Sequence, residues 1–170
     1  MNRGCLYAVT GNASDAVHMI TSGMTSYRST GAEVWIPFYL SCLARAHAEL
    51  DQLDDAWRCI GEAIKAVTTS GERWWEPEVH RIAGEIALIS PEPHAEKAEA
   101  CFERALVVAR QQRAKSWELR GASSLARLWR DQGKRGKARD LLAPVYGWFT
   151  EGFDTPDLKE AKALLDELRA

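Results

Sequence analysis

The stretch HAEKAEACFERALVVAR, residues 94–110, contains the pattern that decides the fold. Within it a small residue, an apolar residue and a second small residue follow at steps of four and three, as Ala98, Phe102 and Ala105. Residues three and four apart lie on one face of an α-helix. Because the two alanines are small, a neighbouring helix can approach this face closely. The stretch therefore predicts one helix of a packed pair.

The same spacing recurs along the chain at a nearly constant period. Copies begin at Ala16, Ala56, Ala98 and, less closely matched, Ala138, which are 40, 42 and 40 residues apart. Several repeats in phase at such a period indicate an array of stacked helical units. Two further markers recur with the same period. The first lies 12 to 14 residues before each later copy, at Leu43-Ala44, Ala83-Gly84 and Leu125-Ala126. The second lies about 15 residues after each copy, at Gly31, Gly71, Ala114 and Gly152.

The steps of three and four predict helices throughout, and no segment alternates with period two, so we expect no sheet. Turn residues fall between the expected helices, at Gly11-Asn12, Ser70-Gly71, Pro91-Glu92-Pro93 and Gly133. The expected helices are a fragment before Thr10 and the ranges 13–28, 33–50, 54–69, 74–89, 94–112, 116–132, 136–150 and 156–169.

The predicted fold is an all-α, right-handed α-α superhelix of about four helical hairpins with a C-terminal capping helix. We expect residues 1–170 to form one domain, with repeats at about 1–30, 31–71, 72–114 and 115–153 and the cap at 155–169.

The two ends of the array differ in polarity. Thr155-Pro156-Asp157 has the residues of a helix start, and the helix after it is apolar on one face and charged on the other. The N-terminal copy has no such cap, and Met19, Ile20, Met24 and Tyr27 follow without a polar face. The chain therefore looks cut from a longer array, and self-association of a homodimer through residues 1–30 is the simplest way to cover these residues.

Composition restricts the class of protein. Apolar residues make up 46% and charged residues 27% of the chain, which is typical of globular proteins. The net charge of −2 argues against nucleic acid or an anionic membrane as partner. No apolar run approaches the roughly 18 residues of a membrane span, and the N-terminus does not resemble a secretion signal. Four widely spaced cysteines without a CxxC motif favour a reducing, cytoplasmic compartment.

The sequence contains no recognisable catalytic or metal site. The candidate ligands lack structural-zinc spacing, and no Cys or Ser is marked as a nucleophile by a base and an orienting group. We therefore expect no enzyme activity, no metal and no cofactor. The residues considered are His18, His47, His80, His94, Cys5, Cys42, Cys59 and Cys101.

The repeat markers resemble the tetratricopeptide repeat (TPR). The Ala-x3-Phe-x2-Ala of its second helix is literal at Ala98, Phe102 and Ala105, and the Leu-Ala of its first helix is literal at Leu43-Ala44 and Leu125-Ala126. The period of about 40 exceeds the usual 34, so longer helices are expected.

A second resemblance concerns about residues 70–169. The segments Glu72–Glu76, Ser116–Arg120 and Leu141–Leu168 are similar to the C-terminal region of bacterial multidomain regulators, in which an adenylate cyclase or DNA-binding domain precedes a P-loop ATPase and TPR-like repeats follow. This chain has no GxxxxGK[ST] motif, so the resemblance implies a regulatory region that does not bind ATP by itself.

The TPR resemblance implies that the first helix of each pair lines a concave surface. Positions three before and one after its small residue then face the groove, which places Ser41, Arg45, Arg81, Glu85, Ser123 and Arg127 there, with Arg120 and Arg130 nearby. Several arginines on one surface favour an acidic ligand. The alternative is that they pair inside the groove with Glu49, Glu78, Glu85, Glu118 and Asp131. If Trp75 points inward, its neighbour Trp74 points about 100° away from it and is the candidate binding aromatic.

The expected function is non-catalytic binding of a protein, an acidic peptide or another domain of a parent chain. Three alternatives stay open. A pocket lined by Trp and Arg would favour a small-molecule sensor, a clustered His/Cys/Glu site would favour an enzyme, and a one-sided basic surface would favour nucleic-acid binding.

Overall fold

The computed structural model describes residues 2–90 and 94–169, and within them every regular element is an α-helix. Pro91, Glu92 and Pro93, where a turn was expected, lie outside the described residues. The helices are α1 Asn2–Thr10, α2 Ala13–Arg28, α3 Ile36–Glu49, α4 Leu53–Ser70, α5 Glu76–Ile89, α6 Ala95–Gln111, α7 Lys115–Asp131, α8 Arg135–Tyr146 and α9 Pro156–Arg169.

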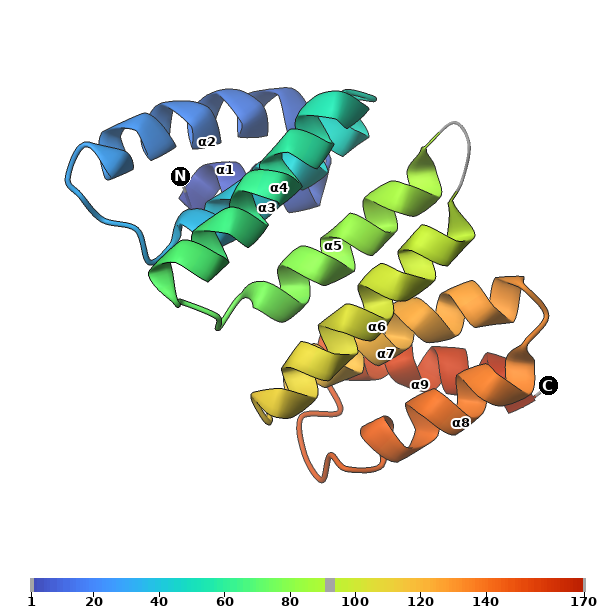
Figure 1. Cartoon of the computed structure of the whole chain (residues 1–170). Coiled ribbons are helices and arrows are strands. Elements are labelled where there is room, and N and C mark those ends of the chain that lie inside the picture. Colours follow the sequence, from blue (N-terminus) through green and yellow to red (C-terminus); the bar gives the residue numbers. More distant parts are fainter. Residues whose placement is uncertain (1, 91–93, 170) are drawn as a thin grey trace.

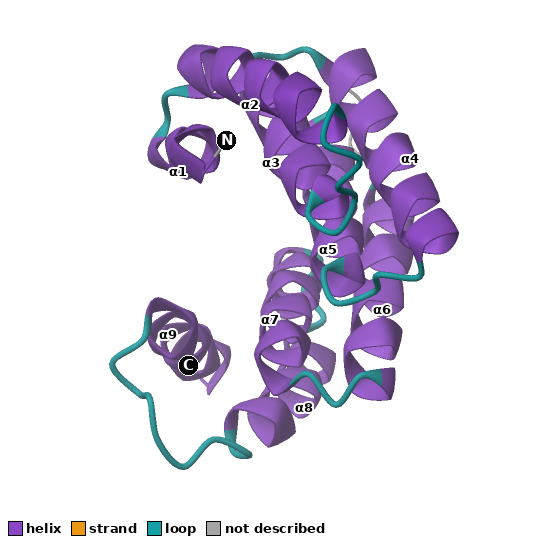
Figure 2. Cartoon of the chain, turned by 90° about the vertical axis from the view of Figure 1, so that its left-hand side faces the viewer, coloured by secondary structure: helices purple, strands orange, loops and turns teal. Residues whose placement is uncertain are grey.

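The helices form consecutive pairs that stack into a curved array (Figure 1). Each helix packs on the next along the chain, and α1, α3, α5, α7 and α9 also pack on one another in that order. Figure 2 shows the result: these five helices follow the inner side of an arc, with α1 and α9 at its two ends. The all-α solenoid expected from the repeat spacing is confirmed.

The small residues act as expected at the contact between paired helices. Ala98, Phe102 and Ala105 of α6 are almost completely buried. The Phe102 ring lies against Gly84 of α5, where a Cβ atom would be only 2.7 Å from Phe102 Cδ1. Gly84 is thus a close-approach site, at which the missing side chain makes room for an aromatic ring.

Observed helix ends differ from the expected ones by up to four residues. The largest difference is at α8, which ends at Tyr146 rather than at 150, with Pro144 inside its last turn. Proline in this turn removes a backbone donor and favours an early end. In the third repeat the left-handed residue at the pair-to-pair turn is Arg113, with φ of 55°, where the other turns use Gly31, Gly71 and Gly152.

The predicted C-terminal cap is confirmed, whereas the prediction that the apolar face of the N-terminal repeat is uncovered is wrong. Leu158, Leu164, Leu165 and Leu168 of α9 are all buried. At the other end Ile20 and Met24 are also buried, and the Tyr27 ring packs edge-on against Tyr39 at 5.9 Å. The apolar face of α2 is covered within the chain because α1, which carries no repeat marker, packs on both α2 and α3.

Most of the buried apolar residues of the described chain form two clusters that meet within α5. One extends from Cys5 to Ile86, and the other begins at the next residue, Ala87, and extends to Leu168. The half-buried ring of Trp57 packs against both clusters. No helix in the described ranges is long and apolar enough to cross a membrane.

Candidate functional site

The inner side of the arc contains a polar cavity of about 390 Å³ between α3, α5, α7 and the start of α9. Its charged lining consists of four arginines and four carboxylates: Arg45, Arg81, Arg120 and Arg127, with Glu78, Glu85, Asp157 and Glu160. The formal charges of these eight side chains cancel. The cavity is therefore lined by a network of paired opposite charges rather than by a basic patch.

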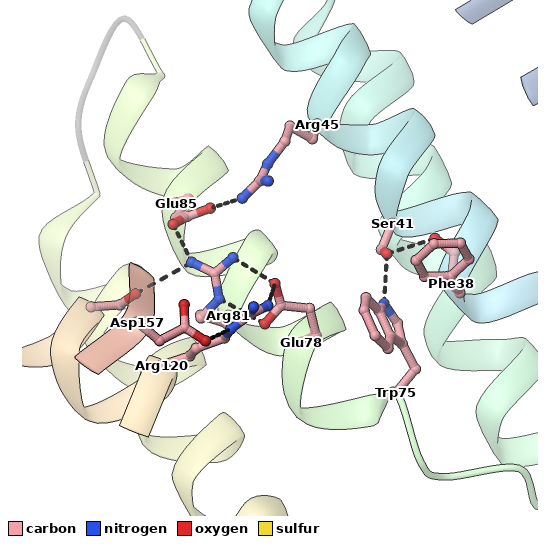
Figure 3. Close-up of polar contacts among 10 residues, drawn as sticks. Phe38, Ser41, Arg45, Trp75, Glu78, Arg81, Glu85, Arg120 and Asp157 are labelled. Carbon is pink, nitrogen blue, oxygen red and sulfur yellow. Dashed lines mark hydrogen bonds and ion pairs between the residues drawn. The ribbon is translucent and has the colours of Figure 1, made fainter. Parts of the chain in front are cut away.

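A buried ion pair forms the floor of this cavity (Figure 3). The Arg81 guanidinium donates from Nε and Nη2 to the two carboxylate oxygens of Glu78, at 2.8 and 2.7 Å. Its remaining terminal nitrogen donates to Glu85 of the next helical turn and to Ser124 Oγ of α7. Both Arg81 and Glu78 are less than 10% exposed. A bidentate pair of this kind fixes both side chains in one geometry.

The pair stays ionised although it is buried. Burial raises the pKa of Glu78, but hydrogen bonds and positive charge from Arg81, with smaller contributions from Arg120 and Arg45, outweigh it and hold that pKa below its ordinary value. Burial likewise lowers the pKa of Arg81, and Glu78 and Glu85 more than reverse the effect. Breaking the pair would leave an unpaired charge in a buried place, which is costly.

Three further ion pairs form the rim of the polar cavity, and they are more exposed than the Arg81–Glu78 pair. Arg45 of α3 reaches Glu85 at 3.1 Å, which links α3 to α5. Arg120 of α7 donates to Asp157 of α9 at 2.7 Å and lies 3.6 Å from Glu78. Arg127 donates to Glu160 at 2.7 Å. These pairs are partly solvated, so each contributes little to stability and is easily exchanged.

A second, mostly apolar cavity of about 340 Å³ lies between α1, α3 and α5. Phe38, Trp75 and Ile82 are among its lining residues, and it shares Arg45, Glu78 and Arg120 with the polar cavity. Trp75 Nε1 donates to Ser41 Oγ at 2.8 Å, which holds the indole against this wall (Figure 3). The concave side therefore presents an apolar and a charged compartment that meet at two arginines.

The six residues placed on the groove by their offset from the small positions all line these two cavities. Arg45, Arg81, Glu85, Ser123 and Arg127 line the polar one, and Ser41 lines the apolar one. Arg120 lies between them and lines both.

Two of the candidate site residues lie elsewhere. Arg130 pairs with its neighbour Asp131 and with Glu167 of α9, and it lines neither cavity. Trp74 also lies outside both linings, because its half-buried ring packs edge-on between Trp35 and Trp75, with centroids 4.9 and 5.0 Å away. It belongs to a row of aromatic rings at the start of the inner helices, a row that continues from Trp75 to Trp117.

The arginines pair inside the groove, as the second of the two sequence interpretations states, but with partly different partners. Glu78 and Glu85 are partners as expected, whereas Glu118 pairs with Arg110 and Lys115. Sequence reasoning missed Asp157 and Glu160. Their spacing of three residues at the start of an expected helix placed both on one face, but the orientation of that helix toward α7 was not evident from the sequence.

The groups needed for metal binding are not assembled in the part of the chain that the structure describes. Within residues 2–90 and 94–169, no cluster of three or more His, Cys, Asp or Glu side chains could hold a metal ion.

Comparison with known proteins identifies the architecture. No protein-family profile matches the chain, and no curated protein matches it. Among solved structures it is similar to the "Podosopora anserina putative kinesin light chain nearly identical TPR-like repeats", which is matched in two crystal structures, one of them of a variant form. In each case the identity is 16%, the TM-score is 0.66, and the match covers 99% of this chain and 90% of the other. This similarity shows that the fold is a TPR-like repeat solenoid.

Proposed function

We propose that the concave groove binds a segment of a partner protein that presents an acidic group beside an apolar side chain. One observation supports this most directly: the charged and apolar cavities share Arg45 and Arg120. A ligand that extends from the apolar cavity past these arginines would place its acidic group in the polar cavity, beside Arg120 and Arg127. TPR-like solenoids present extended concave surfaces of this kind, and as a class they are interaction scaffolds.

Exchange of ion pairs is the mechanism we propose for binding. Glu78 is held in the buried pair with Arg81, so it stays in place. The side chains of Asp157 and Glu160 are 36% and 63% exposed, and each pairs with one arginine. A ligand carboxylate replaces them at Arg120 and Arg127 without leaving a buried charge unpaired. The resulting affinity is modest and depends on salt, because the pairs lost and gained are similar.

The experiment measures binding of an acidic peptide library, by fluorescence anisotropy, to the wild-type chain and to the Arg120→Gln/Arg127→Gln double variant. Peptides that bind the wild type should bind the double variant at least tenfold more weakly. Arg130→Gln is the matched control, since Arg130 is also an α7 arginine paired with an acid of α9 but lines neither cavity. Equal binding by all three proteins would refute the proposal.

A second candidate function is small-molecule sensing. The apolar cavity is lined by Trp75, Arg45 and Arg120, and its volume of about 340 Å³ lies in the range typical of ligand pockets. Aromatic carboxylic acids are the matching probes, and quenching of tryptophan fluorescence would report them. Quenching that persists in Trp75→Phe would argue against this cavity as the site.

We also propose that residues 1–170 form one domain, with repeats at 1–30, 31–71, 72–114 and 115–153 and a cap at 155–169. This domain has a regulatory, non-catalytic role in the cytoplasm, like the repeat region of the bacterial multidomain regulators that the sequence resembles. A homodimer through residues 1–30 was expected because apolar residues there would otherwise be uncovered. That argument no longer holds, because Ile20 and Met24 are buried within the chain. Light scattering at high concentration tests it directly, and a strict monomer rules it out.

A further inference from the structure

The apolar cavity brings together two thiols from different parts of the chain. Cys5 of α1 and Cys42 of α3 both line it, and their thiols lie near enough for each to shift the pKa of the other. The two helices pack together directly. The other two cysteines are placed differently: Cys59 is fully buried in α4 and Cys101 is half-buried in α6, and neither lines this cavity.

We propose that Cys5 and Cys42 form a site of reversible thiol oxidation, at which a hydroperoxide converts the two thiols to a disulfide that joins α1 to α3. Formation of this disulfide does not require the proposed partner binding. The cavity admits small molecules, with about 340 Å³ of space beside the two sulfurs, so a small oxidant can reach Cys5 although that residue is only 7% exposed.

The surroundings of the two sulfurs determine which one reacts first. The interaction with the Cys42 side chain lowers the pKa of Cys5 more than burial raises it. The same interaction, together with burial, raises the pKa of Cys42 far above its ordinary value. We therefore assign the first attack to Cys5, because the thiolate is the reactive form of a cysteine.

The chemistry balances in two steps. The Cys5 thiolate attacks one peroxide oxygen, the O–O bond breaks, and the leaving alkoxide or hydroxide takes up a proton, which gives Cys5 sulfenic acid and an alcohol or water. Cys42 sulfur then attacks Cys5 Sγ, the S–OH bond breaks, and the Cys42 proton leaves with the hydroxide as water. The two sulfurs together lose two electrons, which the peroxide gains. A dithiol reductant converts the disulfide back to two thiols.

The disulfide changes the groove as well as the thiols. It ties the short α1 helix to α3 at the wall of the apolar cavity, between two residues that are 37 positions apart in the sequence. Transient disulfides of this type are the kind found in reducing compartments, where they serve redox sensing.

The test treats the full wild-type chain with hydrogen peroxide, alkylates the remaining thiols under denaturing conditions, and counts adducts by intact mass. We expect two alkylated thiols in place of four, a cross-linked peptide that contains Cys5 and Cys42, and a return to four after dithiothreitol. Four alkylated thiols after peroxide, or oxidation at Cys59 or Cys101 instead, would overturn the proposal. This measurement needs no variant, so a folding defect cannot obscure it.

Variants then test the order of attack. In Cys42→Ser, peroxide should leave a sulfenic acid on Cys5 that dimedone labels, whereas in Cys5→Ser the Cys42 position should stay unlabelled. The matched control is Cys59→Ser/Cys101→Ser, which should form the disulfide as the wild type does. Dimedone on Cys42 rather than on Cys5 would contradict the assigned roles.

Discussion

The indole Nε1 of Trp75 donates a hydrogen bond to the hydroxyl oxygen of Ser41, 34 positions earlier in the chain, at 2.8 Å. That hydroxyl is completely buried and itself donates to the carbonyl oxygen of Phe38 at 2.8 Å. One serine therefore satisfies the indole of Trp75, which immediately precedes α5, and a backbone carbonyl of α3. The contact joins the inner helices of two successive repeats and sets the position of the apolar cavity wall.

Ser41→Ala should destabilise the protein by about 1–3 kcal/mol, because the Trp75 Nε1 group loses its acceptor in a partly buried place. Urea unfolding measures the loss. Trp75→Phe retains an aromatic ring but removes the donor, so the double variant should lose less than the sum of the two single variants, with a coupling energy of about 1 kcal/mol. Strictly additive losses would mean that the two groups do not interact.

Gly84→Ala should destabilise the chain by about 1–3 kcal/mol, because the added methyl group overlaps the Phe102 ring and forces the α5–α6 pair apart. Gly61→Ala is the matched control. Gly61 also lies inside a helix, but its added Cβ meets nothing within 4 Å. There the change should stabilise by about 0.5–1 kcal/mol through helix propensity. A neutral Gly84→Ala would show that α5 and α6 do not pack as closely as described.

Glu78→Gln should cost about 3–5 kcal/mol at neutral pH, because it leaves Arg81 charged and buried without its bidentate partner. Chemical denaturation measures the loss. Glu160→Gln breaks an exposed pair with Arg127 and should cost less than about 1 kcal/mol. Similar losses for the two variants would contradict the distinction between floor and rim.

The buried pair also gives stability a pH dependence. Because the pKa of Glu78 in the folded chain lies below its ordinary value of 4.5, its contribution is fully present above that value. The contribution is lost as the pH falls through the lower, folded-state pKa. The wild type should therefore lose stability on acidification below about pH 4.5 more steeply than Glu78→Gln does. Parallel pH profiles would show that Glu78 does not titrate as described.

Deletion of residues 156–170 should cause aggregation or a clear fall in melting temperature, because α9 covers apolar surface of α7 and α8. Leu165→Ala is the milder form and should cost about 2–5 kcal/mol. Lys162→Ala changes the opposite, exposed face of α9 and should leave stability nearly unchanged. A truncated chain as soluble and stable as the intact one would disprove the role of α9 as a cap.

The helix positions could be predicted because packing requires small residues at helical spacing, and Ala44, Gly84 and Ala126 mark this in successive inner helices. Once these residues face the paired helix, another face of the same helix is left for the groove, and Arg45 and Arg81 on that face line the polar cavity. Asp157 and Glu160 were not found, since an acid that faces a groove looks in sequence like an acid that faces solvent. Their position depends on how residues 147–155 turn α9 back toward α7.

The contact between Cys5 and Cys42 could not be predicted either. Helix α1 carries no copy of the repeat marker, so the sequence contains no register for it against α3. Only the packing of the two helices shows that cysteines in different repeats share one cavity.

The division of the core between Ile86 and Ala87 has a consequence for cooperativity. In a solenoid each unit stabilises only its neighbours, so the whole array unfolds as one when the interfaces between units are strong. Here α5 contributes to both clusters, and Trp57 packs against each of them. We expect these contacts to couple the two clusters, so that they unfold in a single transition. When they are weakened, either end of the array can undergo subglobal opening while the other end stays protected from amide exchange.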